Sequence, residues 1–197
     1  SPAARRLSLG KTLTISVIVP FFTRPAEIER LRGIQKIVAE SDYDLIIYNV
    51  ENVEQRDTYM REIPRKERTD GVIIISLSPR NEDIPYLVNA DVPIVLVDAN
   101  HPSLDQLNRV IIDDIQGGRQ ATQHLIDIGH SRIGFISDYL DEPLNFTSSR
   151  DRYKGYRQIL QAAGIPFISQ YHLQGEHGRP QSYRMAIELL SLPPPPT

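Results

Sequence analysis

Short runs of aliphatic residues alternate along this chain with longer segments whose apolar residues recur at helical spacing. This alternation is typical of βα units built on a parallel sheet. The short runs are apolar on successive residues, which indicates strands covered by helices on both faces. We therefore predict an α/β fold with a doubly wound sheet. The predicted strands cover residues 15–20, 45–50, 71–76, 93–98, 109–113 and 132–138.

Three further segments carry apolar stripes that predict helices, at residues 28–38, 120–128 and 150–163. Gly129 and Gly164 directly follow the second and third segments. Glycine is common at this position because it adopts the left-handed conformation that ends many helices. We therefore expect both helices to stop at these glycines.

Composition and charge restrict the class of protein. The 197 residues include no cysteine, which excludes disulfides, thiolate nucleophiles and zinc ribbons and suits a reducing compartment. No apolar run approaches the roughly 18 residues of a membrane span, and residues 1–10 do not read as a signal peptide. The net charge of −3 argues against a surface devoted to nucleic acid. We expect a cytoplasmic protein with no membrane contact.

Sequence motifs for nucleotide, metal and hydrolytic sites do not occur in the chain, among them G-x-G-x-x-G, H-E-x-x-H and G-x-S-x-G. The one glycine pair, Gly117 and Gly118, opens a helix after Asp113, whose carboxylate favours the positive helix end. His124 and His130 fall on different helical faces, and no hydrolytic triad is singled out. We therefore expect no catalytic residue, no metal and no cofactor.

The residues that follow the predicted strands are the first candidates for a binding site, because doubly wound sheets bind ligands beyond the carboxyl ends of their strands. They are Phe21, Phe22, Ser76, Asp98 and Asp138. Two adjacent aromatic rings can form an apolar wall for a sugar or a base, and Asp98 can accept hydrogen bonds from hydroxyls. The alternatives are that the phenylalanines belong to the core and that the aspartate caps a turn.

The segment from Val110 to Ile136 resembles the middle of the lactose-repressor/galactose-repressor (LacI/GalR) family of bacterial transcription regulators. It carries the family pattern V-x-x-D-x-x-x-G-x-x-x-A-x-x-x-L-I-x-x-G-H-x-x-I. The resemblance continues at Ser149–Arg150, at Gly155–Tyr156 and at residues 160–165. The first half of the chain agrees as well, at residues 14–20, 31–34, 70–76 and 93–98, so the resemblance covers nearly the whole chain. It implies a periplasmic-binding-protein-like fold of two Rossmann-like subdomains with parallel sheets.

The same resemblance implies a domain plan. Residues 1–12 would be a hinge-helix remnant and linker, residues 13–108 the N-terminal subdomain, and residues 109–197 a C-terminal subdomain that is incomplete at its C-terminus. A helix-turn-helix head would precede the chain. Ala4, Arg5 and Leu7 resemble the end of the hinge helix, where the family's leucine wedges into the minor groove of operator DNA.

The resemblance further implies a DNA-binding transcription regulator, a repressor, whose core binds a small effector between its subdomains. Arg150 resembles the family's arginine that hydrogen-bonds effector hydroxyls or a carboxylate. Asp98, Phe21, Phe22 and Ser76 resemble cleft positions of the first subdomain. Phe146 would stack on an effector ring or anchor an exposed loop.

A homodimer is implied as well, because palindromic operators mirror a two-fold symmetric protein. The family's interface maps to residues 27–38 and 48–53, with Ile28, Leu31 and Tyr48 as candidate contacts. The alternative is that Ile28 and Leu31 simply cover their own sheet.

Other functions remain open at this point. A solute-binding protein of a sugar transporter shares the fold, but the hinge-like residues 4–7 argue against it. An enzyme would need a cofactor fingerprint, which the sequence lacks. A sugar, a sugar phosphate, a purine and an amino acid all suit these candidate residues as effector, and we expect a sugar.

Overall fold

The computed structural model describes residues 10–197, so the predicted hinge residues Ala4, Arg5 and Leu7 lie outside the described residues. The chain divides into two compact units. Unit 1 is Ser1–Ile111 together with Pro143–Asn145, and unit 2 is Ile112–Glu142 together with Phe146–Thr197. Unit 1 extends to Ile111, whereas the expected subdomain boundary lies after residue 108. The extra residues belong to unit 1 because residues 108–110 form a strand that pairs with its sheet.

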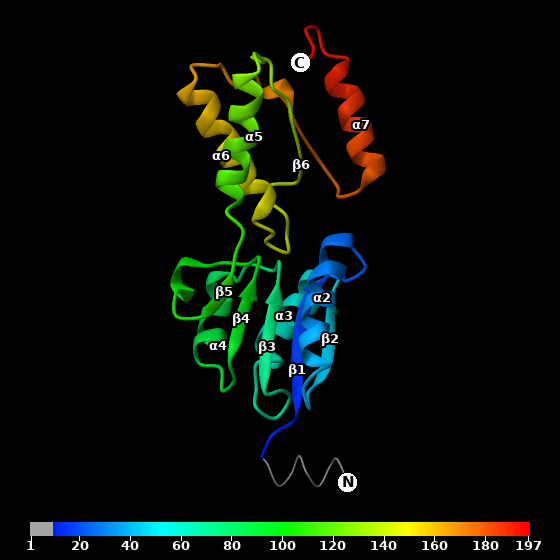
Figure 1. The fold of residues 1–197 in the computed structure, drawn as a ribbon, viewed down its shortest axis with the longest axis vertical. Coiled ribbons are helices and arrows are strands. Elements are labelled where there is room, and N and C mark those ends of the chain that lie inside the picture. The colour runs from blue at the N-terminus through cyan, green and yellow to red at the C-terminus, as the bar shows by residue number, and fades with distance from the viewer. Residues whose placement is uncertain (1–9) are drawn as a thin grey trace. The chain divides into compact units, whose positions relative to one another are not determined.

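Unit 1 is built on a parallel sheet of five strands in the order β2-β1-β3-β4-β5 (Figure 1). The strands are β1 (Thr14–Pro20), β2 (Asp44–Val50), β3 (Gly71–Ile75), β4 (Ile94–Val97) and β5 (Asn108–Val110). Ile15 of β1 lies beside Leu45 of β2 on one side and Gly71 of β3 on the other. The five strands predicted for this part of the chain are confirmed.

Helices cover both faces of this sheet. Val17, Ile18 and Val19 are consecutive in β1 and each is fully buried, although their side chains alternate between the two faces. The helices of unit 1 are α2 (Pro25–Val38), α3 (Val53–Glu62) and α4 (Ile84–Val88). Leu31 of α2 packs on Val17 and Val19 in one core cluster. Crossovers between parallel strands are nearly always right-handed, which puts α3 and α4 on the opposite face from α2. These two helices contact each other.

Unit 2 contains a two-stranded parallel sheet and three helices. The strands are β6 (Phe135–Asp138) and β7 (His172–Gly175), and the helices are α5 (Asp114–Asp127), α6 (Ser148–Ala162) and α7 (Arg179–Leu190). Gly129 and Gly164 have φ angles of 97° and 67°, so the predicted left-handed endings of α5 and α6 are confirmed. The sequence did not predict β7, because its sequence His-Leu-Gln-Gly holds a single aliphatic residue.

Two glycines let α5 and α6 pack closely. A Cβ atom on Gly118 would lie 2.2 Å from a backbone oxygen of α6, and one on Gly155 would lie 2.1 Å from a backbone oxygen of α5. The stripe predicted for α5, which consists of Ala121, Leu125 and Ile128, was partly wrong: Ala121 is exposed and Ile128 is 59% exposed, whereas Gly118 and Thr122 are buried. Hydropathy does not reveal such a contact face, because the residues that permit it are small rather than apolar.

Two predicted strands were too long. The segment 109–113 ends as a strand at Val110, because the carboxylate of Asp113 accepts a hydrogen bond from the Gln116 N–H at 2.8 Å and caps α5. The segment 132–138 begins as a strand only at Phe135. The backbone oxygen of Arg132 instead accepts a hydrogen bond from the Thr197 N–H at 2.7 Å.

Candidate functional site

Three of the predicted site residues occupy equivalent places on three strands. Phe21, Ser76 and Asp98 directly follow β1, β3 and β4, and their φ angles are 42°, 57° and 51°. The N–H of each donates to the carbonyl of the last residue of a neighbouring strand, at 3.1, 2.9 and 2.8 Å respectively. A left-handed conformation costs a non-glycine residue about 1–2 kcal/mol, and such strain gathers at functional sites. The carboxyl edge of this sheet is therefore the candidate site.

Two of these residues are joined by ionic hydrogen bonds to helix α2. The Arg30 guanidinium donates from Nη1 to Oε1 of Glu27 at 2.9 Å and from Nη2 to Oδ2 of Asp98. The Ser76 hydroxyl donates to the same Oε1 of Glu27 at 3.1 Å. We call Glu27, Arg30, Ser76 and Asp98 the edge cluster.

The edge cluster has the chemistry of a hydrogen-bond acceptor. It combines two carboxylates with one guanidinium, so its formal charge is −1. Ionised carboxylates only accept hydrogen bonds, and each oxygen can accept more than one. Hydrogen bonds that involve charged groups are also stronger than neutral ones. The cluster therefore suits a ligand that presents hydroxyl groups better than an anionic ligand.

The two adjacent phenylalanines differ in their surroundings. The Arg24 guanidinium lies over the Phe21 ring, 3.9 Å from its centroid, in cation–π geometry. Phe22 is 41% exposed, and its backbone N–H donates to Oδ1 of Asn49 at 3.1 Å. Both residues lie at the carboxyl end of β1, as expected.

Sequence reasoning did not single out Glu27 and Arg30 as site residues. Glu27 is 6% exposed, although a glutamate is almost never buried unless it is paired. It also precedes Leu31 by four residues, which places both on the buried face of α2. A charged residue on the same helical face as Leu31, just before the predicted stripe at residues 28–38, was the signal that could have identified it.

The other predicted site residues lie in unit 2 or just before its helix α6. Arg150 is exposed in the first turn of α6, and Phe146 is half-buried in the preceding segment. Burial raises the pKa of the neighbouring Asp151 carboxyl, and the charge of Asp114 raises it further, whereas Arg150 lowers it. Asp114 in turn accepts a hydrogen bond from Nε of Arg152 at 2.6 Å. The start of α6 thus carries a set of mutually interacting charges.

The strand ends of unit 2 have different neighbours from the charged carboxyl edge of the unit 1 sheet. Asp138 at the end of β6 lies 3.2 Å from Nδ1 of His177. Burial lowers the pKa of His172, as does the charge of Arg157, and the His172 ring stacks on Tyr153 with centroids 4.2 Å apart. Aromatic packing therefore dominates this part of unit 2.

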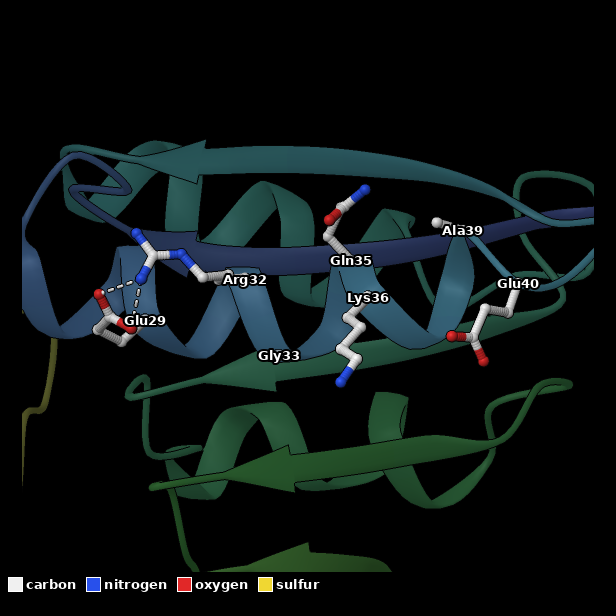
Figure 2. Close-up of a pocket in the computed structure, with 7 residues that line it drawn as sticks. All are labelled: Glu29, Arg32, Gly33, Gln35, Lys36, Ala39 and Glu40. Carbon is white, nitrogen blue, oxygen red and sulfur yellow. Dashed lines mark hydrogen bonds and ion pairs between the residues drawn. The ribbon is translucent and has the colours of Figure 1, made fainter.

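The three predicted dimer contacts lie in different environments. Leu31 is 8% exposed and belongs to the core of unit 1, Ile28 is 40% exposed, and Tyr48 packs edge-on against Tyr59. Figure 2 shows an open hollow on the outer side of α2. It is lined by Glu29, Arg32, Gly33, Gln35, Lys36, Ala39 and Glu40. The outer surface of this helix is therefore mostly charged.

No helix within residues 10–197 is long and apolar enough to cross a membrane. In that same range, three or more histidine, aspartate or glutamate side chains do not gather in a way that could hold a metal ion.

Comparison with known proteins gives a family and named relatives. Residues 12–197 match the family of periplasmic binding proteins and sugar binding domain of LacI family. The chain is 31% identical over 194 residues to catabolite control protein A of Priestia megaterium. It is also 31% identical over 195 residues to the ribose operon repressor of Escherichia coli K12. Each match covers 98% of this chain and 57% of the relative.

A solved structure supports the same assignment. The complex of the transcriptional regulator CelR with cellobiose superposes with a TM-score of 0.73 at 27% identity, covering 96% of this chain and 62% of that one. The chain thus spans somewhat more than half the length of the relatives it matches. Their names agree with the expectation that the chain is not an enzyme.

The α/β fold with parallel sheets, the predicted pattern at residues 110–136 and the match over residues 12–197 all lead to one assignment. The chain belongs to the LacI family of transcriptional regulators, of which it represents the periplasmic-binding-protein-like effector-binding domain.

Proposed function

We propose that this chain is the effector-binding core of a transcriptional repressor and that its effector is a sugar. The edge cluster is the observation that carries the proposal: two carboxylates, held by Arg30 at the carboxyl edge of the sheet, present acceptors for sugar hydroxyls. The strained backbone of Ser76 and Asp98 supports a binding role for this edge.

The polyol character of the effector is favoured by the charge of the edge cluster. An anionic effector would meet the two carboxylates Glu27 and Asp98, whereas neutral hydroxyls donate to carboxylates readily. Two of the matching proteins are a ribose operon repressor and a regulator in complex with cellobiose. We further propose that Arg150 donates to the same sugar and that Phe21, Phe22 and Phe146 pack against its ring.

The regulatory part of the proposal concerns DNA. An effector changes operator affinity only if it binds the DNA-competent and the DNA-incompetent arrangements with different affinities. We propose that a DNA-reading head joined through residues 1–12 binds the operator, with Ala4, Arg5 and Leu7 at the minor groove. Such a protein acts in the cytoplasm, where its operator DNA is.

We also propose a homodimer formed through α2 and the edge strand β2. Ile28 and Ile37 of α2 and Ile47 of β2 are 40%, 68% and 43% exposed, respectively. An interface with two-fold symmetry would cover the same patch on both subunits. We expect sedimentation measurements to show a dimer that Ile37→Glu weakens, whereas Ile187→Glu, on α7 of unit 2, leaves it unchanged.

A ligand screen tests the sugar effector. Thermal unfolding is followed with D-ribose, cellobiose, hypoxanthine and glucose 6-phosphate, since a ligand that binds only the native state raises the melting temperature. We expect a neutral sugar to give a shift that Asp98→Asn and Arg150→Ala remove. Asparagine preserves the size of Asp98 and tolerates its positive φ, and Arg184→Ala on α7 is the matched control. A shift with hypoxanthine or the sugar phosphate alone would refute the sugar effector.

An operator-binding assay on the whole protein tests the regulatory role. We expect the sugar found in the screen to change operator affinity at least tenfold. Unchanged affinity at saturating sugar would contradict regulation and favour the rival function of a solute-binding protein.

A further inference from the structure

The chain enters the sheet of unit 1 through a bent segment. Leu13, which directly precedes β1, has a φ angle of 52°. Leucine rarely adopts this left-handed conformation, because its Cβ atom then crowds the backbone. Strained backbone of this kind persists only where the surrounding structure holds it. The contacts of residues 12–14 must therefore hold this bend in place.

The carboxylate of Asp70 binds the bent segment at two consecutive residues. Its Oδ1 accepts a hydrogen bond from the Thr12 N–H at 3.0 Å, and its Oδ2 accepts one from the Leu13 N–H at 2.9 Å. Hydrogen bonds to an ionised carboxylate are stronger than bonds between neutral groups. The two bonds span 58 and 57 residues of chain. Asp70 therefore ties the segment before β1 to the segment before β3.

Further hydrogen bonds continue this attachment at Thr14. Its backbone oxygen accepts from the Asp70 N–H at 2.9 Å and from the Thr69 hydroxyl at 3.0 Å. Its own hydroxyl donates to the backbone oxygen of Arg68 at 3.2 Å. Thr14 is 7% exposed and Thr69 is fully buried, so water has little access to these bonds. We call the following residues the anchor: Thr12, Leu13, Thr14, Thr69 and Asp70.

Two neighbouring strands connect the anchor with the candidate site of the same unit. Leu13 directly precedes β1 and Phe21 directly follows it, whereas Asp70 directly precedes β3 and Ser76 directly follows it. The two strands pair in parallel with each other. Phe21 and Ser76 are both left-handed residues of the carboxyl edge. The anchor and the candidate site thus lie at opposite ends of one pair of strands, within unit 1 alone.

We infer that Asp70 is a positioning residue for the DNA-reading head. Its carboxylate holds Thr12, the last residue of the proposed linker, and Leu13 in one path at the amino edge of the sheet. The linker then leaves unit 1 in a restricted set of directions, and a change at the carboxyl edge reaches it through β1 and β3. The consequence for DNA rests on the proposed function, but the anchor itself can be measured without DNA or effector.

Hydrogen–deuterium exchange resolved at single amides tests the anchor on the 197-residue chain. We expect Asp70→Ala to accelerate exchange of the Thr12 and Leu13 N–H groups roughly tenfold, because each loses a charged acceptor. The N–H of Ile18, a buried residue of β1, should change much less, which separates local release from general loss of stability. Unchanged exchange at both anchor amides, or equal acceleration at Ile18, would overturn the inference.

Two further variants complete the exchange experiment. Asp105→Ala is the control with the same change of charge, because it removes a carboxylate of unit 1 that accepts from Nη1 of Arg109 at 2.6 Å. We expect it to leave the anchor amides unchanged. Asp70→Asn decides if Asp70→Ala does not fold. Asparagine keeps one acceptor oxygen and replaces the other by a donor, so at least one anchor amide should exchange faster. Acceleration at neither amide would overturn the inference.

Operator binding by the whole protein tests the positioning role. The probe is a DNA duplex that the unaltered whole protein selects from a pool of random sequences. We expect Asp70→Ala to bind this duplex roughly tenfold more weakly, because binding must then order a less restricted head. Removal of a negative charge by itself favours DNA binding, so Asp105→Ala should bind at least as tightly as the unaltered protein. Unchanged or tighter binding by Asp70→Ala would contradict the positioning role.

The sugar from the ligand screen separates this role from a general structural one. We expect Asp70→Ala to show the full thermal shift with the sugar, whereas the sugar changes its operator affinity by less than roughly threefold. Full regulation by the sugar in this variant would show that the anchor does not couple the candidate site to the head. If the unaltered whole protein selects no DNA, the proposed head is wrong, and the exchange measurement still decides whether Asp70 holds the segment before β1.

Discussion

Two arginines of unit 1 each lie between two carboxylates, but their surroundings differ. Arg30 contacts Glu27 and Asp98 at the carboxyl edge of the sheet, and 22% of its side chain is exposed. Arg56 contacts Asp57 and Asp83, and its side chain is completely buried. We call Arg56, Asp57 and Asp83 the buried cluster. The same ionic chemistry thus occurs in the interior of the unit in one place and at a partly exposed sheet edge in the other.

The comparison shows why an ion pair alone does not identify a functional site. The buried cluster ties α3 to η1 (Asn81–Asp83) and to the backbone oxygen of Ser78, and its Arg56 and Asp83 side chains are buried. The edge cluster joins α2 to the left-handed residues Ser76 and Asp98. Backbone strain at strand ends, together with remaining exposure, distinguishes the candidate site from the structural cluster.

The largest effect is expected from Asp83→Ala. This change leaves the buried guanidinium of Arg56 without its best acceptor, and breaking a buried ion pair in this way lowers the free energy of unfolding by about 3–5 kcal/mol. Urea unfolding measures the loss. Asp57→Ala removes the other carboxylate, whose side chain is 39% exposed, and should cost less than about 1 kcal/mol. Equal losses of stability in Asp83→Ala and Asp57→Ala would show that burial does not decide how much each carboxylate contributes.

An intermediate effect on stability is expected from Arg30→Met at the edge cluster. The change removes two charge-assisted hydrogen bonds but leaves Glu27 its hydrogen bond from Ser76. We expect the free energy of unfolding to fall by roughly 1–3 kcal/mol, and the thermal shift with the sugar to disappear. Arg32→Met is the control, because the Arg32 side chain is 68% exposed and pairs only locally with Glu29. A full sugar response in Arg30→Met would remove the edge cluster from the site.

Added salt tests the same difference between the edge cluster and the buried cluster, with a smaller expected effect on stability. Raising the ionic strength from 0.1 to 1 M shortens the screening length from about 10 to about 3 Å, and partly exposed charges are screened more than buried ones. We expect 1 M NaCl to reduce the stability loss of Arg30→Met by roughly half and to leave that of Asp83→Ala unchanged. Urea titrations at both salt concentrations measure this, and equal salt effects on the two losses would contradict the distinction.

The smallest effect is expected from His172, a half-buried titratable group in unit 2 that lies among aromatic rings rather than carboxylates. Burial lowers the pKa of His172 below its usual value, with Arg157 adding to the shift. The folded state therefore disfavours the protonated ring, so its contribution to stability is present above about pH 6.5 and is lost as pH falls. We expect His172→Gln to flatten the pH dependence of unfolding between pH 7.5 and 5. An unchanged slope would show that His172 does not contribute to it.

Much of the fold was predictable because parallel strands have a simple signature. Val17, Ile18 and Val19 must all be apolar when both faces of β1 are covered. By contrast, β7 was missed because its sequence lacks such a run. The contact face of α5 was also misassigned, because Gly118 shows its role only when α6 lies against it.

The candidate site was half predictable. Phe21, Ser76 and Asp98 follow from the rule that ligands bind beyond the carboxyl ends of parallel strands. Glu27 and Arg30 come from a helix that the sequence places near no particular strand end. Their hydrogen bonds with Ser76 and Asp98 span 49 and 68 residues of chain, and no local pattern encodes such a separation.

The sequence by itself determined the alternation of strands and helices, the glycine endings of α5 and α6 and the family pattern at residues 110–136, because periodicity and turn chemistry are local properties of the chain. The tertiary structure decided which charged residues are buried, such as Glu27 and Arg56, and which small residues allow helices to touch, such as Gly118 and Gly155. Each of these depends on residues far apart in sequence, and only folding brings such residues within hydrogen-bonding distance.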